Sequence, residues 1–81
     1  MLIIYTEHAV QRMLERNITP EIIRSIIEKP DGTIKQSFDK YIFYKKVKGR
    51  KDNKIAIVTV KKAEKSFEVI TVMINFEVIK W

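Results

Sequence analysis

The stretch that decides the fold is residues 6–30, which read TEHAVQRMLERNITPEIIRSIIEKP. Apolar residues recur there at three- and four-residue spacing in two separate runs, and this period is that of amphipathic helices. We expect a first helix from about Glu7 to Arg16 and a second from Pro20 to just before Pro30. The predicted buried stripes are Ala9, Val10, Met13 and Leu14 in the first helix, and Ile22, Ile23, Ile26 and Ile27 in the second.

Residues suited to helix ends flank both runs. Thr6 and Thr19 are candidate N-caps, because a threonine hydroxyl can accept a hydrogen bond from an N–H group of the first turn. Pro20 suits the first helical position, where its missing N–H costs nothing. Asn17 can take the left-handed conformation that ends a helix, and Ile18 can then pack back on it. The sequence therefore predicts two helices joined by a short connection.

After Gly32 the apolar period changes to two residues, which is typical of strands. The predicted strands are Leu2–Tyr5 before the helices, and Thr33–Phe38, Tyr41–Val47, Ile55–Val60 and Phe67–Phe76 after them. Residues 55–60 are apolar on both alternations, so this strand should be central. A tight turn is expected at Asp39-Lys40. The elements predict one α+β domain over residues 1–81, ordered β-α-α-β-β-β-β, with the helix pair packed on a mainly antiparallel sheet.

Composition excludes several classes of protein. The 81 residues include no cysteine and one histidine, which excludes disulfides, thiol catalysis and a three-histidine zinc site. Gly32 and Gly49 are the two glycines, so no glycine-rich phosphate loop exists. No carboxylate cluster indicates magnesium, and no cofactor or metal is expected. No apolar run approaches the length of a membrane span, and we expect a cytoplasmic protein.

Positive charge is concentrated in the middle of the chain. Residues 40–65 hold ten Lys/Arg against two acidic residues, a net charge of +8, whereas residues 1–39 and 66–81 each carry −1. A concentrated cationic segment is what a polyanion partner such as RNA requires. The predicted nucleic-acid contacts are Lys45, Lys46, Lys48, Arg50 and Lys51. The alternative is a lysine-rich hairpin that merely keeps a small protein soluble.

The predicted strand at residues 41–47 adds aromatic side chains to this segment. Its side chains face alternate sides of the sheet, with Tyr41, Phe43, Lys45 and Val47 on one side and Ile42, Tyr44 and Lys46 on the other. Tyrosine and lysine together can stack on bases and contact phosphates in single strands. In the alternative interpretation, Tyr41 and Phe43 belong to the core and the lysines protect the edge of the sheet.

Three polar residues of the first helix form a second candidate site. His8, Arg12 and Arg16 recur every four residues, which places them along one stripe. Arginine binds phosphate oxygens through two hydrogen bonds, and histidine can transfer a proton near neutral pH. If this stripe is functional, its side chains should open into a groove shared with the sheet or its basic hairpin. Otherwise it is the solvated flank of an amphipathic helix.

The stripe also carries a resemblance to a known family. Residues 5–18 resemble the signature of the small bacterial and archaeal family catalogued as domain of unknown function 4258. The matching positions are Thr6, His8, Ala9, Arg12, Met13, Arg16 and Ile18, while Asn17 stands where the family usually has glycine. Residues 67–74 are similar to the family's closing strand. In element order this family is similar to the RelE, ParE and BrnT toxins, most of which are metal-independent endoribonucleases held by an antitoxin, although some relatives inhibit topoisomerase.

The resemblance implies a RelE/BrnT-like toxin or a toxin-derived RNA-binding protein. In such an endoribonuclease Arg12 and Arg16 would stabilise the phosphorane, and His8 would be general base or general acid. One histidine cannot be both at once, so Tyr44 or Lys45 would have to be its partner. The alternative is a non-catalytic module that binds nucleic acid or an antitoxin-like protein. The oligomeric state stays open.

Overall fold

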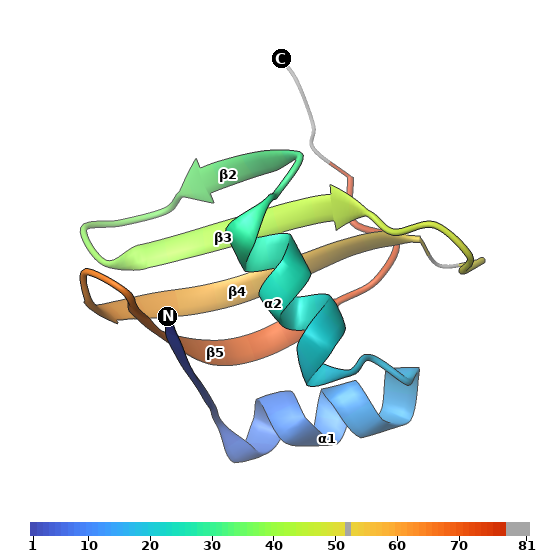
Figure 1. Ribbon diagram of the computed structural model, residues 1–81, viewed down its shortest axis with the longest axis horizontal. Helices are drawn as coiled ribbons and strands as arrows, with labels where there is room; N and C mark the ends of the chain where they lie inside the picture. Colours follow the sequence, from blue (N-terminus) through green and yellow to red (C-terminus); the bar gives the residue numbers. More distant parts are fainter. Residues whose placement is uncertain (52, 78–81) are drawn as a thin grey trace.

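Two helices and five strands follow one another in the predicted order (Figure 1). The computed structural model describes residues 1–51 and 53–77, and these counts refer to that part of the chain. The elements are β1 (Leu2–Tyr5), α1 (Glu7–Arg16), α2 (Pro20–Glu28), β2 (Gly32–Lys35), β3 (Lys40–Lys46), β4 (Lys54–Ala63) and β5 (Ser66–Met73). The fold class is therefore α+β, as predicted.

The predicted helix ends are confirmed. The Ala9 N–H donates to Thr6 Oγ1 at 3.1 Å, and the Ile22 N–H donates to the hydroxyl oxygen of Thr19 at 3.3 Å. Asn17 ends α1 in the left-handed conformation, with φ of 54°. The chain then returns on the helix, because the Ile18 N–H donates to the Met13 carbonyl and the Ile18 side chain is 3% exposed. These local hydrogen bonds end α1 and begin α2.

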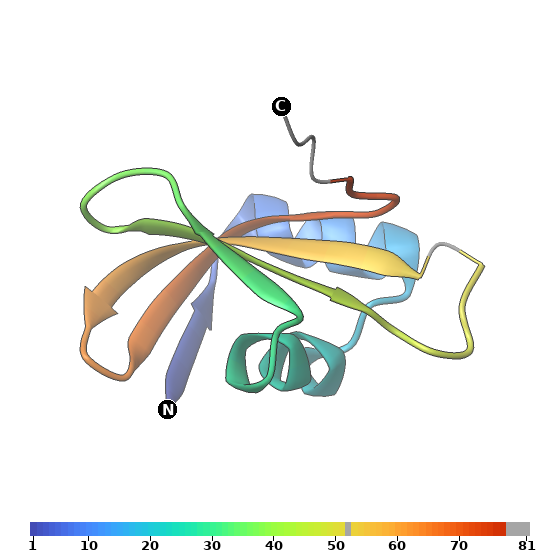
Figure 2. The same ribbon diagram turned by 90° about the horizontal axis from the view of Figure 1, so that it is seen from above.

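The sheet is mixed, with the strand order β1-β5-β4-β3-β2. The pair β1–β5 is parallel and the other three pairs are antiparallel. The predicted central strand is β4, and it is apolar on both faces. Ile55 and Ile57 belong to the core under the helices, whereas Ala56 and Val58 belong to a second cluster on the opposite face. Figure 2 shows α2 on one side of this twisted sheet and residues 74–77, which follow β5, on the other.

The aromatic residues of β3 separate as the alternation predicts. Phe43 is buried in the helix-side core. Its ring packs edge-to-face with the Phe67 ring, with the ring centroids 5.5 Å apart, and Tyr41 stacks beside it. The core interpretation of Tyr41 and Phe43 is thus confirmed. Tyr44 lies in the second cluster, on the face that α2 does not cover.

The prediction for the α1 stripe is half wrong. Ala9 and Met13 are buried, but Val10 is 42% exposed and Leu14 is 75% exposed. The reason is that α1 contacts mainly β5, beside the sheet, whereas α2 lies across β3 and β4 (Figure 1). A helix beside a sheet buries a narrower stripe than one lying across it.

Three strand ends also differ from the prediction by three residues each. The strand predicted at Ile55–Val60 continues to Ala63, where β4 still pairs with β5 at Ser66. The strand predicted at Thr33–Phe38 ends three residues early, at Lys35, because the N–H groups of Gln36 and Ser37 both donate to the Lys40 carbonyl. The turn predicted at Asp39-Lys40 therefore lies at residues 36–39, and Lys40 already belongs to β3. The strand predicted at Phe67–Phe76 ends at Met73. Asn75 has a left-handed φ of 54°, which its short polar side chain tolerates, and it turns the chain back toward the sheet.

In the described part of the chain, neither helix has the length and apolar character that crossing a membrane requires.

Candidate nucleic-acid interface

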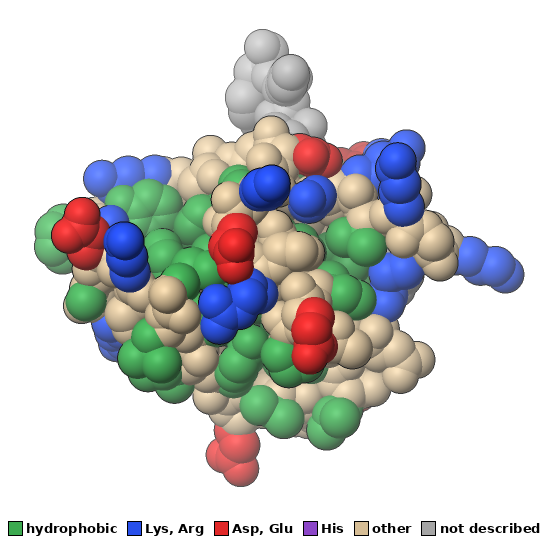
Figure 3. Space-filling view, viewed as in Figure 1, with side chains coloured by type: hydrophobic (Ala, Val, Ile, Leu, Met, Phe, Trp, Pro, Cys, Tyr) green, Lys and Arg blue, Asp and Glu red, His purple; other side chains and the backbone are tan. Residues whose placement is uncertain are grey.

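The cations of residues 40–65 lie at two ends of the sheet instead of forming one patch. Because β3 and β4 run antiparallel, Lys46 lies opposite Lys54 and Lys40 lies opposite Val60. Six residues of strand at about 3.3 Å each separate the two ends by about 20 Å. The hairpin end, around the β3–β4 turn, carries Lys45, Lys46, Lys48, Arg50, Lys51 and Lys54. The far end, around the β2–β3 and β4–β5 turns, carries Lys35, Lys40, Lys61, Lys62 and Lys65. Figure 3 shows Lys and Arg side chains projecting at both ends.

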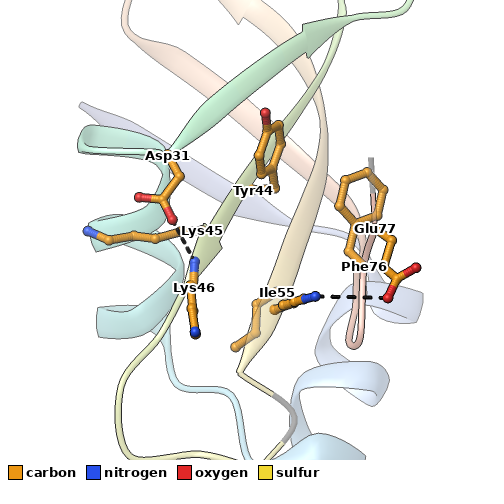
Figure 4. A pocket seen from close by; sticks show the side chains of 8 residues that line it. Asp31, Tyr44, Lys45, Lys46, Ile55, Phe76 and Glu77 are labelled. Carbon is orange, nitrogen blue, oxygen red and sulfur yellow. Dashed lines mark hydrogen bonds and ion pairs between the residues drawn. The ribbon is translucent and has the colours of Figure 1, made fainter. Parts of the chain in front are cut away.

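An open hollow of about 360 Å³ lies at the hairpin end, on the face that α2 does not cover (Figure 4). It is lined by Asp31, Tyr44, Lys45, Lys46, Lys54, Ile55, Phe76 and Glu77. Its apolar wall is formed by the rings of Tyr44 and Phe76, whose centroids are 5.7 Å apart at an interplanar angle of 38°. We call this feature the Tyr44–Phe76 hollow.

The return of the chain after β5 builds one wall of this hollow. The left-handed Asn75 directs Phe76 back to β4, where the Phe76 N–H donates to the Lys54 carbonyl at 3.0 Å. The sequence interpretation did not include Phe76, Lys54 or Asp31 in the site. The single local signal for this turn is Asn75, because asparagine tolerates positive φ better than most residues.

The position of the Tyr44 ring in the hollow depends on Gly32. The phenol ring of Tyr44 lies directly over this glycine, so a Cβ atom at residue 32 would clash with the ring. Gly32 and Tyr44 are register partners in the β2–β3 pair. The glycine is therefore required by the close approach of a side chain and not by its backbone conformation.

Like charges face each other at the mouth of the hollow. Lys46 and Lys54 are directly opposite across β3–β4, an arrangement that is destabilising by itself. Two carboxylates moderate it: Glu77 Oε1 lies 3.9 Å from Lys54 Nζ, and Asp31 Oδ2 accepts from the Lys46 backbone N–H at 2.9 Å. The Lys54 side chain stays half-exposed in this ion pair, so its charge stays accessible to an anionic ligand.

Arg50 attaches the β3–β4 turn to α1. Its guanidinium donates to the Asn17 carbonyl at 2.9 Å and to the Arg16 carbonyl at 2.7 Å. These carbonyls form the negative end of the α1 dipole, which favours a cation. The structure thus gives this predicted RNA contact a positioning role. Lys48 and Lys51, on the same turn, are exposed.

Arg16 donates to a backbone carbonyl of β5 that has no neighbouring strand to pair with. The strand β1 pairs with β5 only as far as Val69, after which the chain turns into α1. Beyond that point the Thr6 hydroxyl donates to the Ile70 carbonyl at 3.0 Å, and Arg16 Nη1 donates to the Val72 carbonyl at 2.8 Å. Side chains at the two ends of α1 therefore satisfy the uncovered edge of β5, which would otherwise expose unpaired carbonyls.

The other two residues of the stripe lie apart from Arg16. Arg12 Nη1 is 3.3 Å from Glu15 Oε1, on the surface. His8 is exposed and lines a shallow hollow with Tyr5, Glu7, Val10, Gln11 and Leu14, while Arg16 lines one with Glu15, Asn17, Arg50, Lys51 and Ile74. Eight residues of α-helix rotate the side-chain direction by about 80°. Among the described residues, the structure does not bring His8, Arg12 and Arg16 together with Tyr44 and Lys45.

Tyr5 supplies a prediction about stability. Burial raises the pKa of its phenol, an effect that Arg24 opposes and Glu21 reinforces. The folded protein then retains the Tyr5 proton at a pH where the unfolded chain has lost it. Stability from this group is therefore full below pH 10.0, the ordinary value, and is lost as the pH rises above it. Urea titrations from pH 8 to pH 11 should show a steeper loss in the wild type than in Tyr5→Phe. Equal slopes would contradict the prediction.

Comparison with known proteins identifies one family. The family model described as "Domain of unknown function (DUF4258)" matches residues 5–74, which include both helices and nearly the whole sheet. No curated protein and no solved structure matches the chain.

Proposed function

The chain belongs to the DUF4258 family, whose description assigns no activity, and from its surface we propose that it binds single-stranded RNA at the hairpin end. The Tyr44–Phe76 hollow with Lys46 and Lys54 at its mouth carries this proposal. Aromatic rings supply stacking for an unpaired base, and lysines supply contacts for the phosphates on either side of it.

The hollow favours a single strand over a duplex. An unpaired base can leave the stack and pack against Tyr44 and Phe76, whereas a base within a duplex is stacked on its neighbours. The carboxylates of Asp31 and Glu77, at the rim, can accept a hydrogen bond from a ribose 2′-hydroxyl. DNA lacks this hydroxyl, so we expect the protein to bind RNA more tightly than DNA of the same sequence.

Exposed lysines of the β3–β4 turn extend the surface beyond the hollow. Lys48 and Lys51 are exposed and can bind the phosphates that follow the bound base along the strand. Arg50 acts indirectly, because its bonds to the end of α1 hold this turn in place. Arg16 is likewise used within the fold.

The test is fluorescence anisotropy with a labelled twelve-nucleotide oligouridylate at several salt concentrations. Lys48→Glu and Lys51→Glu are each expected to weaken binding severalfold and to reduce the salt slope by about 0.7, the value for one phosphate contact in a single strand. Arg24→Glu is the matched control, because it also replaces an exposed cation by glutamate, within α2 and outside the lining of the hollow. Equal losses in all three variants, or no binding at 50 mM salt, would remove the proposal.

Cleavage and a toxin role come only from the resemblance, and the proposal does not require them. Endoribonuclease activity would need a proton acceptor and a proton donor around one phosphate, and His8 shares no hollow with Tyr44 or Lys45 among the described residues. We expect RNA incubated with the protein in EDTA to stay intact. Cleavage that His8→Ala abolishes would restore the metal-independent endoribonuclease. An antitoxin-like protein partner stays a prediction. Co-expression with the product of the neighbouring gene, followed by purification of the complex, would test it.

A further inference from the structure

The far end of the sheet carries the most exposed large apolar side chain among the described residues. Phe38, in the β2–β3 turn, is 89% exposed. The turn is held by backbone hydrogen bonds on both sides, from the Gln36 N–H to the Lys40 carbonyl at 2.9 Å and from the Lys61 N–H to the Asp39 carbonyl at 2.7 Å. The exposure of this ring therefore belongs to a fixed turn and not to a loose one.

Lysines flank the turn that carries this ring, at the end of β2, at the start of β3 and on β4. Lys40 follows it at the start of β3, and the Lys61 backbone is bonded to Asp39, the next residue after Phe38. Lys35 precedes the turn, with its Nζ 5.8 Å from the centroid of the Tyr41 ring. Lys62 is engaged by Glu68 at 3.5 Å. This end has more lysines than acidic residues. The lysines are Lys35, Lys40, Lys61, Lys62 and Lys65, and the acidic residues are Asp39, Glu64 and Glu68.

The far end thus repeats the chemistry of the hairpin end, where aromatic rings also stand among lysines. We propose that it is a second contact for the same single strand, with one base stacked on Phe38 and a phosphate bound by Lys40, which the alternation of β3 places on the same face as Tyr44. This inference rests on the proposed RNA binding at the Tyr44–Phe76 hollow. Its consequence is a length requirement, because the turn that carries Phe38 begins four residues of strand, about 13 Å, from Tyr44 along β3.

A short strand reaches one contact and a long strand reaches both. A dinucleotide has one internucleotide step, about 3.4 Å when stacked and about twice that when extended, so it cannot span the two contacts, whereas twelve stacked nucleotides cover about 40 Å. Base–aromatic stacking then predicts that Phe38→Ala weakens binding of the twelve-nucleotide oligouridylate at least about fivefold and leaves binding of the dinucleotide UpU unchanged. Phe38→Trp should keep the long-strand affinity. Leu14→Ala, at a similarly exposed apolar residue of α1, is the matched control and should change neither.

The same titrations separate this inference from the proposed function. If Phe38→Ala leaves the long-strand affinity unchanged while Tyr44→Ala weakens both strands, the second contact is wrong and RNA binding at the hollow stands. If the wild type binds neither strand, the proposed function itself fails. A lipid surface is the competing ligand for an exposed ring among lysines. Flotation with vesicles containing phosphatidylserine, weakened by Phe38→Ala when RNA binding is not, would also overturn the inference.

Discussion

Gly32→Ala is expected to lower the free energy of unfolding by about 1–3 kcal/mol, the range for an added methyl group that displaces a packed side chain. The new Cβ would occupy the space of the Tyr44 phenol, whose ring also packs against Phe76. The ring must move, so the Tyr44–Phe76 hollow changes shape. RNA binding should weaken together with stability, although residue 32 contributes no side chain to the surface.

The sign of this effect should reverse when the ring is removed. In a Tyr44→Ala background, Gly32→Ala meets no phenol. Alanine then restricts the unfolded chain more than glycine does, which stabilises a protein by about 0.4–1 kcal/mol. Urea denaturation of the four proteins in this cycle measures the coupling directly. If Gly32→Ala is as stable as the wild type, or equally harmful in both backgrounds, the packing of Tyr44 on Gly32 is not what requires the glycine.

Arg16→Met is expected to lower the free energy of unfolding by about 1.5–3 kcal/mol, the range for a hydrogen bond made by a charged group. The substitution keeps an unbranched apolar chain but removes the donor to the Val72 carbonyl. That carbonyl lies on the edge of β5 that β1 no longer covers. Hydrogen exchange should rise in the last residues of β5, which α1 would then hold less firmly.

Arg12→Met is the matched control for this experiment. The same substitution is made one helical turn away, where Arg12 forms an exposed ion pair with Glu15, and such pairs are typically worth less than about 1 kcal/mol. Its stability should stay close to that of the wild type. RNA affinity per folded molecule should be unchanged in both variants. Similar stability for both would show that the Arg16–Val72 bond does not stabilise the fold. A loss of RNA affinity in Arg16→Met at full folding would show that Arg16 acts in the ligand site.

Local sequence accounts for most of the architecture. The threonine caps, the left-handed Asn17 and the change of apolar period after Gly32 predicted the order of the elements, and the doubly apolar β4 predicted its central place. These signals act between residues close in the chain, or through alternation along one strand, so they can be read without knowing what packs where.

For the candidate site, the sequence predicted some residues and missed others. Tyr44, Lys45 and Lys46 were found from the alternation of β3, and the charge of the β3–β4 turn was found from composition. Phe76 and Lys54 were not, because their meeting depends on a turn at Asn75 that brings the chain back across β4. Nothing in the spacing of residues 54 and 76 indicates that they are neighbours.

What the sequence by itself determined is the set of elements, the ends of the two helices and the total charge of residues 40–65. What only the tertiary structure decided is where that charge lies and what the arginines bind. The antiparallel pairing of β3 with β4 divides the lysines between two ends of the sheet. The packing of α1 beside β5 gives Arg16 a carbonyl 56 residues away as its acceptor. Charge and periodicity are properties of the chain, but the acceptor of a long side chain depends on which backbone groups the fold leaves unpaired beside it.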